Sequence, residues 1–264
     1  MFFPKLNVGA GLAAATIAAS MLVATPSQAT ITSFASYSAV NSSSNIYWKN
    51  SASDGASSKS GTLFTSSTNG STAGSTTIKF SFLQPGLNVV SNVTATFTLL
   101  ATVTNVAASS LGPQQTQKGL TGSFSIISTA PITISGYTYA AGTNLLSATF
   151  TNASINGTSS GGVRDATSGA NAGTITYTSA FLNFLPTVDK DFSLSLTSIT
   201  PSLAHSTGNA LKTFRANSTG TFSTDPVPAI VIPVPEAATW AMFIAGFGLM
   251  GATLRRRRPE HSLV

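Results

Sequence analysis

The side chains that could carry out acid–base chemistry between residues 30 and 225 are one histidine, His205, and five aspartates. This region has no glutamate and the chain has no cysteine, which excludes disulfides and a thiolate nucleophile. A glycosidase generally needs two carboxylates that flank the scissile bond. A secreted hydrolase would therefore need several of the aspartates to meet in one cleft: Asp54, Asp165, Asp189, Asp191 and Asp225. His205 is expected in a solvated loop. Since residues 30–225 offer few other groups for acid–base chemistry, the sequence predicts no catalytic residue and a protein that is not an enzyme.

One pair of aspartates is compatible with a metal site. Asp189 and Asp191 lie on either side of Lys190, and carboxylates bind Ca²⁺ when about six to eight oxygens surround the ion. A solvated strand edge accounts for the same three residues, and we predict no metal site.

The segment GFGLMG, residues 246–251, has the G-x-G-x-x-G spacing of dinucleotide-binding loops. That fingerprint requires a preceding strand and a following crossover helix. Here Pro233 and Pro235 precede the segment, and a run of arginines comes soon after it. We therefore expect the glycines to belong to an apolar helix, where small residues permit close helix–helix approach, and we predict no cofactor.

The amino-terminal segment, residues 1–29, is typical of a secretory signal peptide. Lys5 precedes an apolar stretch of small residues, and Ser27-Gln28-Ala29 forms a small-x-small cleavage pattern. We expect cleavage between Ala29 and Thr30, and export of the remaining chain.

Near the carboxyl end, residues 237–254 carry no charge and would span about 27 Å as a helix, enough to cross a membrane. Trp240 lies at the end expected at the interface. The next four residues form a stop-transfer signal: Arg255, Arg256, Arg257 and Arg258. These arginines and the tail 259–264 should stay in the cytoplasm. Together with a cleaved signal peptide, this topology places residues 30–225 outside the membrane and the arginines inside.

Pro235-Glu236, Trp240-Ala241, the apolar helix and the arginine run occur along the chain in the order of a known sorting signal. In this arrangement the segment 235–258 resembles the PEP-CTERM signal, in its variant with Trp-Ala after the motif. The resemblance implies recognition by an exosortase in the inner membrane of a Gram-negative bacterium, removal of the tail, and delivery to the cell surface or to exopolysaccharide. Ala237 stands where the family has proline, which removes a rigid backbone constraint.

Residues 30–225 alternate between apolar and polar side chains, as in TIKFSFL (residues 77–83) and NVTATFTLL (residues 92–100). This period is typical of half-buried strands, and clusters of Gly, Asn, Ser and Pro separate the runs. We predict one all-β domain, an antiparallel two-sheet sandwich of jelly-roll type. Residues 226–235 are rich in proline and are expected to form a semi-rigid linker.

The predicted function is that of an exported, non-enzymatic protein of the cell surface or the exopolysaccharide matrix. The alternative is a carbohydrate- or ice-binding module, and a secreted hydrolase is a third possibility. Two threonine ladders and several aromatic side chains favour the module: Thr94, Thr96 and Thr98, Thr174, Thr176 and Thr178, with Trp48, Tyr137, Tyr139 and Tyr177. Nucleic acid is not an expected partner, because the Lys and Arg residues of this region are scattered and cannot neutralise a row of phosphates.

Overall fold

The computed structural model describes residues 32–52, 58–134, 136–158, 166–170, 175–186, 189–224, 227–228 and 247 of the 264-residue chain. Apart from residue 247, these ranges form strands joined by turns and loops, and every strand pair is antiparallel. The all-β, antiparallel architecture predicted from the alternation is confirmed. The strands are β1 (Thr32–Ala39), β2 (Ile46–Asn50), β3 (Gly61–Thr65), β4 (Thr76–Phe82), β5 (Val93–Val103), β6 (Ser109–Leu111), β7 (Gln114–Ser128), β8 (Ile132–Ile134), β9 (Tyr137–Tyr139), β10 (Asn144–Thr158), β11 (Ala166–Ala170), β12 (Ile175–Thr178), β13 (Leu182–Asn183), β14 (Asp191–Thr200), β15 (Phe214–Thr224) and β16 (Val227–Pro228).

Burial follows the alternation of the sequence. In β4, Ile78, Phe80 and Phe82 are buried, whereas Lys79 and Ser81 between them are partly exposed. Successive side chains of a strand point to opposite faces, so an apolar residue at every second position gives the strand one buried face.

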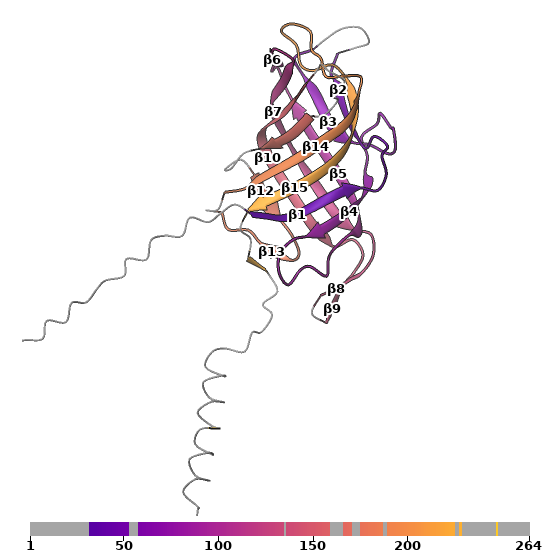
Figure 1. Ribbon diagram of the computed structural model, residues 1–264, viewed down its shortest axis with the longest axis vertical. Helices are drawn as coiled ribbons and strands as arrows, with labels where there is room; N and C mark the ends of the chain where they lie inside the picture. Colours follow the sequence, from indigo (N-terminus) through magenta and orange to yellow (C-terminus); the bar gives the residue numbers. More distant parts are fainter. Residues whose placement is uncertain are drawn as a thin grey trace, which may run out of the picture.

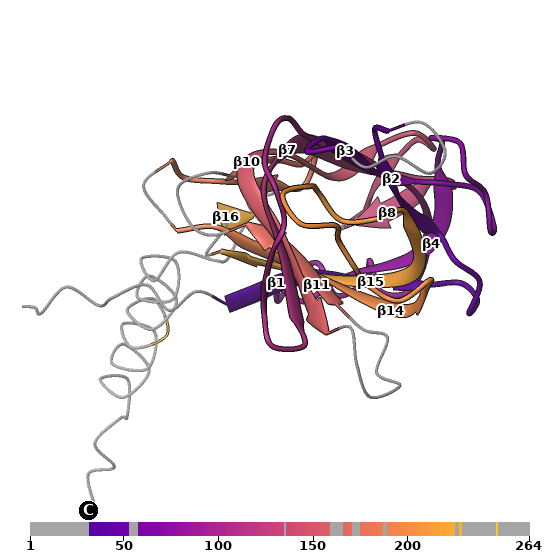
Figure 2. The same cartoon turned by 90° about the horizontal axis from the view of Figure 1, so that it is seen from above.

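The strand pairings close the main sheet on itself (Figure 1). From β15 the hydrogen-bonded path runs through β14, β11, β10, β7, β5, β4 and β1, and the ladder between β1 and β15 returns it to its start. Seen from above, β14 and β15 lie on one side of the interior, and β3 and β7 lie on the other (Figure 2). The two walls of the predicted sandwich are therefore joined along their edges.

One side of this closed sheet forks, because two long strands have different partners at their two ends. β15 pairs with β2 through Phe214–Ala216 and with β1 through Gly220–Thr224. β5 pairs with β3 through Leu100–Val103 and with β4 through Val93–Phe97. The sheet between β15 and β5 thus consists of two arms, β1–β4 and β2–β3, with a gap between them.

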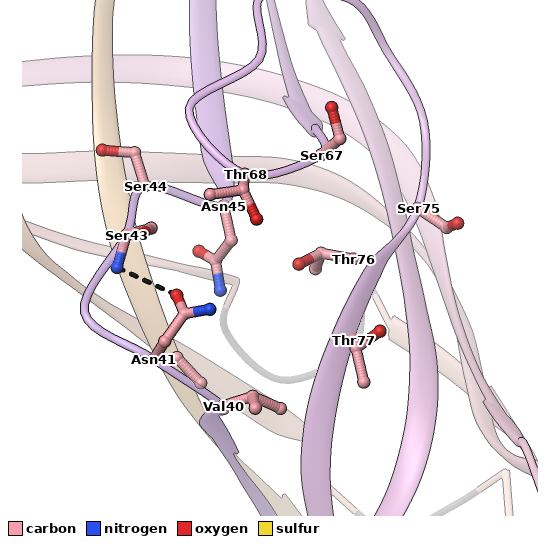
Figure 3. A pocket seen from close by; sticks show the side chains of 11 residues that line it. Val40, Asn41, Ser43, Ser44, Asn45, Ser67, Thr68, Ser75, Thr76 and Thr77 are labelled. Carbon is pink, nitrogen blue, oxygen red and sulfur yellow. Dashed lines mark hydrogen bonds between the residues drawn. The ribbon is translucent and has the colours of Figure 1, made fainter.

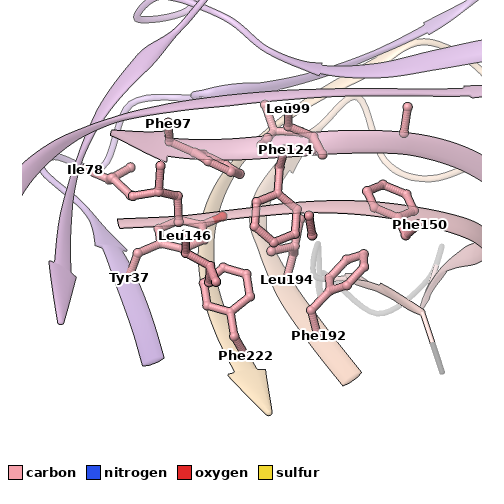
Figure 4. Close-up of a cluster of buried hydrophobic side chains, with 14 of the residues drawn as sticks. Tyr37, Ile78, Phe97, Leu99, Phe124, Leu146, Phe150, Phe192, Leu194 and Phe222 are labelled. Atoms are coloured by element: carbon pink, nitrogen blue, oxygen red, sulfur yellow. The ribbon is translucent and has the colours of Figure 1, made fainter. Parts of the chain in front are cut away.

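The interior is filled by aromatic and aliphatic side chains from both walls (Figure 4). Phe124 of β7 lies near the centre, with its ring centroid 5.1 Å from that of Phe222 and 5.7 Å from that of Phe192. Phe222 and Phe192 come from β15 and β14 on the opposite wall. Burial of such side chains is worth about 1.5–3 kcal/mol each, and the two walls stabilise each other across this core.

The first and the last strand of the closed sheet along the chain lie side by side, since Thr32 at the start of β1 is paired with Thr224 at the end of β15. Beyond that point Val227–Pro228, which the sequence assigned to the linker, pairs with Leu182–Asn183 as strand β16. The paired part of the chain therefore continues to residue 228.

Several predicted segments lie outside the described residues. These are the signal peptide 1–29 with its cleavage site, the rest of the linker 226–235, the sorting segment 235–258 apart from Phe247, and the tail 259–264. Among the residues that are described, no helix is long and apolar enough to cross a membrane.

Candidate binding cleft and sorting motif

A cleft of about 430 Å³ lies between the two arms of the forked sheet (Figure 3). The turn after β1, the residues before β2, the turn after β3 and the start of β4 contribute its walls. Pockets that hold small molecules usually measure about 300–1,000 Å³, so the cleft has the size of a small-ligand site.

Side chains take over the backbone pairing that the fork interrupts. On β15, the backbone N–H of Ser218 donates to Asn45 Oδ1 at 2.9 Å. On β5, the backbone N–H of Leu99 donates to Thr65 Oγ1, also at 2.9 Å. A buried N–H without an acceptor costs about 1–3 kcal/mol. An asparagine and a threonine therefore stabilise the two points at which the sheet divides.

The orientation of the Asn45 amide is fixed by its neighbours. Its Oδ1 accepts a second hydrogen bond from Ser218 Oγ at 3.1 Å, and Ser218 Oγ accepts one from the Tyr37 hydroxyl at 3.0 Å. Because a backbone N–H can only donate, the amide atom that faces Ser218 must be the oxygen. The NH₂ group of Asn45 must then lie on the opposite side.

That NH₂ group is directed into the cleft, toward the space between Asn41 and Thr76 (Figure 3). Asn45 is only 5% exposed, and within the described part of the chain only its Oδ1 has side-chain hydrogen-bond partners. Its backbone is also held, since its N–H donates to Ala216 O at 2.9 Å and its C=O accepts from Ser66 N–H at 3.0 Å. The cleft therefore has a fixed donor on a largely buried side chain, and no described residue provides an acceptor for it.

The turn that forms one wall, residues 40–44, is fixed by three asparagines. Asn41 Oδ1 accepts from the Ser43 N–H at 3.0 Å, and Asn69 Oδ1 accepts from the Ser44 N–H at 3.2 Å. Asn217 Nδ2 donates to the carbonyls of Asn41 and Ser43 at 2.8 and 2.7 Å. The wall is therefore ordered before any ligand arrives, which lowers the entropic cost of binding.

The lining is polar and uncharged. Hydroxyl and amide side chains dominate it, and Ala39 and the half-exposed Val40 add an apolar strip. No ionisable side chain is among the described residues that line it. Such a surface can donate and accept hydrogen bonds but offers no partner for a formal charge.

The two predicted threonine ladders meet on one outer face of the sheet. Thr98 of β5 is paired with Ser125 of β7, Ser125 with Ser147 of β10, and Ser147 with Thr178 of β12. All four side chains are exposed or partly exposed, so they form one row of hydroxyl groups across four strands. Within this row, Thr98 comes from the first predicted ladder and Thr178 from the second. Thr174 of the second ladder lies outside the described residues.

Two of the four aromatic residues that favoured a binding module are buried in the structure. Trp48 is 0% exposed, and its Nε1 donates to Leu211 O at 2.9 Å inside the core. Tyr177 is buried too, and its hydroxyl donates to the backbone carbonyl of Asp191 at 2.6 Å. The prediction that these two rings contact a ligand is wrong, because both lie on the inner face of their strands. Tyr137 is exposed and Tyr139 is partly buried.

The acids and the histidine do not form a recognisable catalytic arrangement in the described ranges. Asp191 is partly buried, and this burial raises the pKa of its carboxyl group, while a hydrogen bond from the Phe192 N–H acts in the opposite direction. Lys190 is buried rather than solvated, and its Nζ donates to Leu185 O at 2.8 Å. His205 Nδ1 lies 2.5 Å from Gln115 Oε1. Among the described residues, no three His, Cys, Asp or Glu side chains lie close enough to hold a metal ion.

Three of the five aspartates, Asp54, Asp165 and Asp225, lie outside the described residues. Their convergence in a hydrolase cleft is therefore not tested by the structure.

Asn45, Ser218 and the cleft were not predicted from the sequence. Asn45 lies in a run of serines and asparagines, NSSSN, that is typical of an ordinary loop. The only local signal is an asparagine directly before the apolar alternation of β2. Its role depends on β15, which is more than 170 positions away along the chain.

Comparison with protein families bears on the other end of the chain. Residues 233–258 match the family model described as the PEP-CTERM protein-sorting motif. The chain carries a PEP-CTERM sorting signal. This signal implies an exported protein that is anchored transiently at the membrane by its carboxyl end and processed by an exosortase. Comparison with curated proteins gave no match, and comparison with solved structures gave none either.

The match covers the residues predicted from the sequence to be recognised, Pro235, Glu236, Ala237 and Trp240, and the arginines Arg255–Arg258. Because these residues lie outside the described ranges, their individual roles stay predictions.

Proposed function

We propose that this protein is a non-enzymatic component of the cell surface or the extracellular matrix, delivered there by its PEP-CTERM signal. In this function the closed β body, residues 32–228, is the part that remains outside the cell, and the segment 235–258 serves only its delivery. The observation that carries the proposal is the PEP-CTERM motif, which stands beside a body composed mainly of Ser, Thr, Gly, Asn and apolar residues.

The composition of the body supports a structural or binding role rather than catalysis. Only 8% of the residues of the chain are charged, against about 25% in an average soluble domain. The described acids, Asp189 and Asp191, are separated only by Lys190, and His205 contacts an amide oxygen of Gln115 instead of a carboxylate. These groups lack the acid, base and nucleophile arrangement that hydrolases use.

Cell fractionation of a host that has an exosortase tests the proposal. The intact chain is expected at the cell surface or in the medium, shortened at its carboxyl end, as intact-mass measurement would show. A chain without residues 235–258 should lose this distribution. A matched control replaces Glu260 by Gln, a change outside the matched segment, and should be delivered like the intact chain. If delivery is the same with and without the segment, or if the intact chain stays in the cytoplasm, the proposal is wrong.

The second candidate function is carbohydrate binding by the body. The neutral cleft in the fork favours it, and the row of hydroxyl groups on the outer face provides a second surface of similar chemistry.

A further inference from the structure

We propose that the cleft between the two arms of the sheet binds a neutral saccharide, one or two sugar units of a larger glycan. The proposal names a partner for the exported body and rests on the proposed function for its biological setting. The binding itself depends only on the cleft, and can be measured without export.

The Asn45 side chain offers the cleft a hydrogen-bond donor. Its Nδ2 group lies in a side chain that is 5% exposed, is aimed into the cleft, and has no acceptor in the described part of the chain. In the free protein this NH₂ group is open to the solvent of the cleft, since it is not among the buried polar atoms without a partner. A ligand with hydroxyl or ether oxygens would supply the missing acceptor, and the tether to Ser218 keeps the donor in position for it.

The absence of charged side chains from the described lining favours a neutral ligand. The side chains that line the cleft are uncharged, so a phosphate, sulfate or carboxylate ligand would be desolvated without a counter-charge. Two nearby cations are engaged elsewhere: Lys79 Nζ donates to Thr94 Oγ1 at 2.8 Å, and Arg215 Nη1 donates to Asn69 O at 3.2 Å. Their ammonium and guanidinium groups are not among the lining groups. The site therefore selects neutral ligands.

The lining of the cleft combines polar and apolar side chains. Hydroxyl groups of Ser43, Thr68 and Thr76 can each donate and accept, and they match a ligand that carries many hydroxyl groups. Val40, which is 50% exposed, provides an apolar contact of the kind that a sugar ring needs for its C–H face. A mixed surface of this kind on a preformed wall is typical of small-molecule sites.

Two variants block the cleft in different ways. Thr68→Trp places a large side chain at an exposed position of the lining, where it should fill the cleft without disturbing the core. Asn45→Asp keeps the oxygen that accepts from Ser218 and removes the NH₂ donor. The matched control is Thr149→Trp, the same substitution at an exposed threonine of β10, which pairs with neither arm of the fork.

The experiment uses the full chain, purified in a detergent whose head group is not a sugar so that it cannot compete. Maltose, cellobiose, mannobiose and galactobiose are titrated calorimetrically up to millimolar concentration, and a glucuronate-containing disaccharide serves as the charged counterpart. At least one neutral disaccharide should bind at one site per chain. Thr68→Trp and Asn45→Asp should each weaken binding by about tenfold or more, which is about 1.4 kcal/mol, while Thr149→Trp leaves it unchanged.

Three results would overturn the proposal. The first is the absence of binding by every neutral disaccharide, and the second is equal or tighter binding of the charged one. The third is binding that persists in Thr68→Trp and is lost in Thr149→Trp, which would assign it to the outer row of hydroxyl groups. Thermal unfolding of each variant shows whether it is folded, and Thr68→Trp decides the matter if Asn45→Asp does not fold.

Failure here is separable from failure of the proposed function. If no sugar binds but fractionation shows delivery that depends on the segment 235–258, only the cleft proposal falls. If a sugar binds but delivery ignores that segment, the proposed function falls and the binding site stands.

Discussion

The hydroxyl groups of two buried serines at the fork, Ser218 and Ser66, differ in their hydrogen bonding. Ser218 Oγ joins the Tyr37 hydroxyl to Asn45 Oδ1, whereas Ser66 Oγ is buried without a hydrogen-bond partner in the described part of the chain. Both side chains are almost fully buried, with exposed fractions of 0% and 1%. The same residue type therefore stabilises the fold at one position and costs free energy at the other.

We expect Ser66→Ala to leave the free energy of unfolding unchanged or to raise it by up to about 1 kcal/mol, because the variant removes an unsatisfied polar group. Ser218→Ala should lower it by about 1–3 kcal/mol, because Tyr37 and Asn45 both lose a partner. Urea denaturation of the two variants and the parent measures both changes. A large loss in Ser66→Ala would mean that this hydroxyl has a partner after all.

Two buried tyrosines make stability depend on alkaline pH. Desolvation raises the pKa of Tyr37 and of Tyr177 well above the ordinary value of about 10. The hydrogen bond between Tyr37 and Ser218 opposes this shift, and the nearby Asp191 carboxylate adds to the shift of Tyr177. Above pH 10 the unfolded chain loses these phenolic protons while the folded chain keeps them. The free energy of unfolding should therefore be constant below about pH 10 and fall as the pH rises further.

Tyr37→Phe should make this fall less steep, since one group no longer titrates differently in the two states, and should cost about 1 kcal/mol at neutral pH through the lost hydrogen bond. Tyr137→Phe is the control, because Tyr137 is 70% exposed and should change neither quantity. Denaturant unfolding between pH 7 and 11, followed with tyrosinate absorbance, measures both. An equally steep fall in Tyr37→Phe would contradict the assignment of the effect to burial.

At the scale of elements, β2 and β3 fit together because one of them has no side chain at the contact. Gly61 of β3 faces the indole of Trp48 in β2, and a Cβ at this position would lie 2.4 Å from Trp48 Cζ2. The indole is also held by its hydrogen bond to Leu211 O and stacks on Phe214, with ring centroids 6.4 Å apart. The arm β2–β3 therefore depends on a glycine at residue 61.

Gly61→Ala should destabilise the protein by about 1–3 kcal/mol, the usual cost of overpacking a well-filled core. Gly74→Ala is the matched control, since no atom lies within 4 Å of a Cβ built there, and it should be close to neutral. Thermal unfolding compares them, and tryptophan fluorescence reports whether the indole has moved. Equal stability of the two variants would show that Trp48 can shift without cost.

A strand could be predicted from the sequence where its own residues alternate between apolar and polar side chains. Alternation located β4 and β5, because an apolar residue at every second position gives a strand one buried face. The fork and its cleft depend on which strands pair, and on Asn45 reaching Ser218 across the sheet. Such long-range pairing leaves no periodic trace in the sequence. Trp48 and Tyr177 were misplaced for a related reason, since an aromatic side chain of an amphipathic strand can belong to either face.

At the scale of the whole molecule, folding and sorting are carried by different parts of the chain. The closed sheet is completed by β1 and β15, and its last described pairing ends at Pro228. The PEP-CTERM match begins at residue 233, after the last strand of the described residues. The body should therefore fold in the same way before and after the sorting segment is removed.

A chain that lacks residues 235–264 should unfold within about 2 °C of the intact chain, because no described pairing is lost. A chain that lacks residues 1–39 should be severely destabilised, because the loss of β1 opens the ring between β4 and β15. Differential scanning calorimetry in the same detergent measures both. A large drop on removal of the sorting segment would show that it packs on the body.

The pairing of β1 with β15 has a mechanical consequence. A membrane anchor would pull on the body through the end of β15, beside Thr224, whereas a glycan in the cleft would pull near Ala39, at the far end of β1. Tension between the two would act along the strands, so that the ladder from Thr32–Thr224 to Tyr37–Gly220 is loaded in shear. In shear the hydrogen bonds of a ladder share the load and must break together, whereas in peeling they break one at a time. The ladder between β1 and β15 would therefore resist tension between the cleft and the carboxyl end of the body.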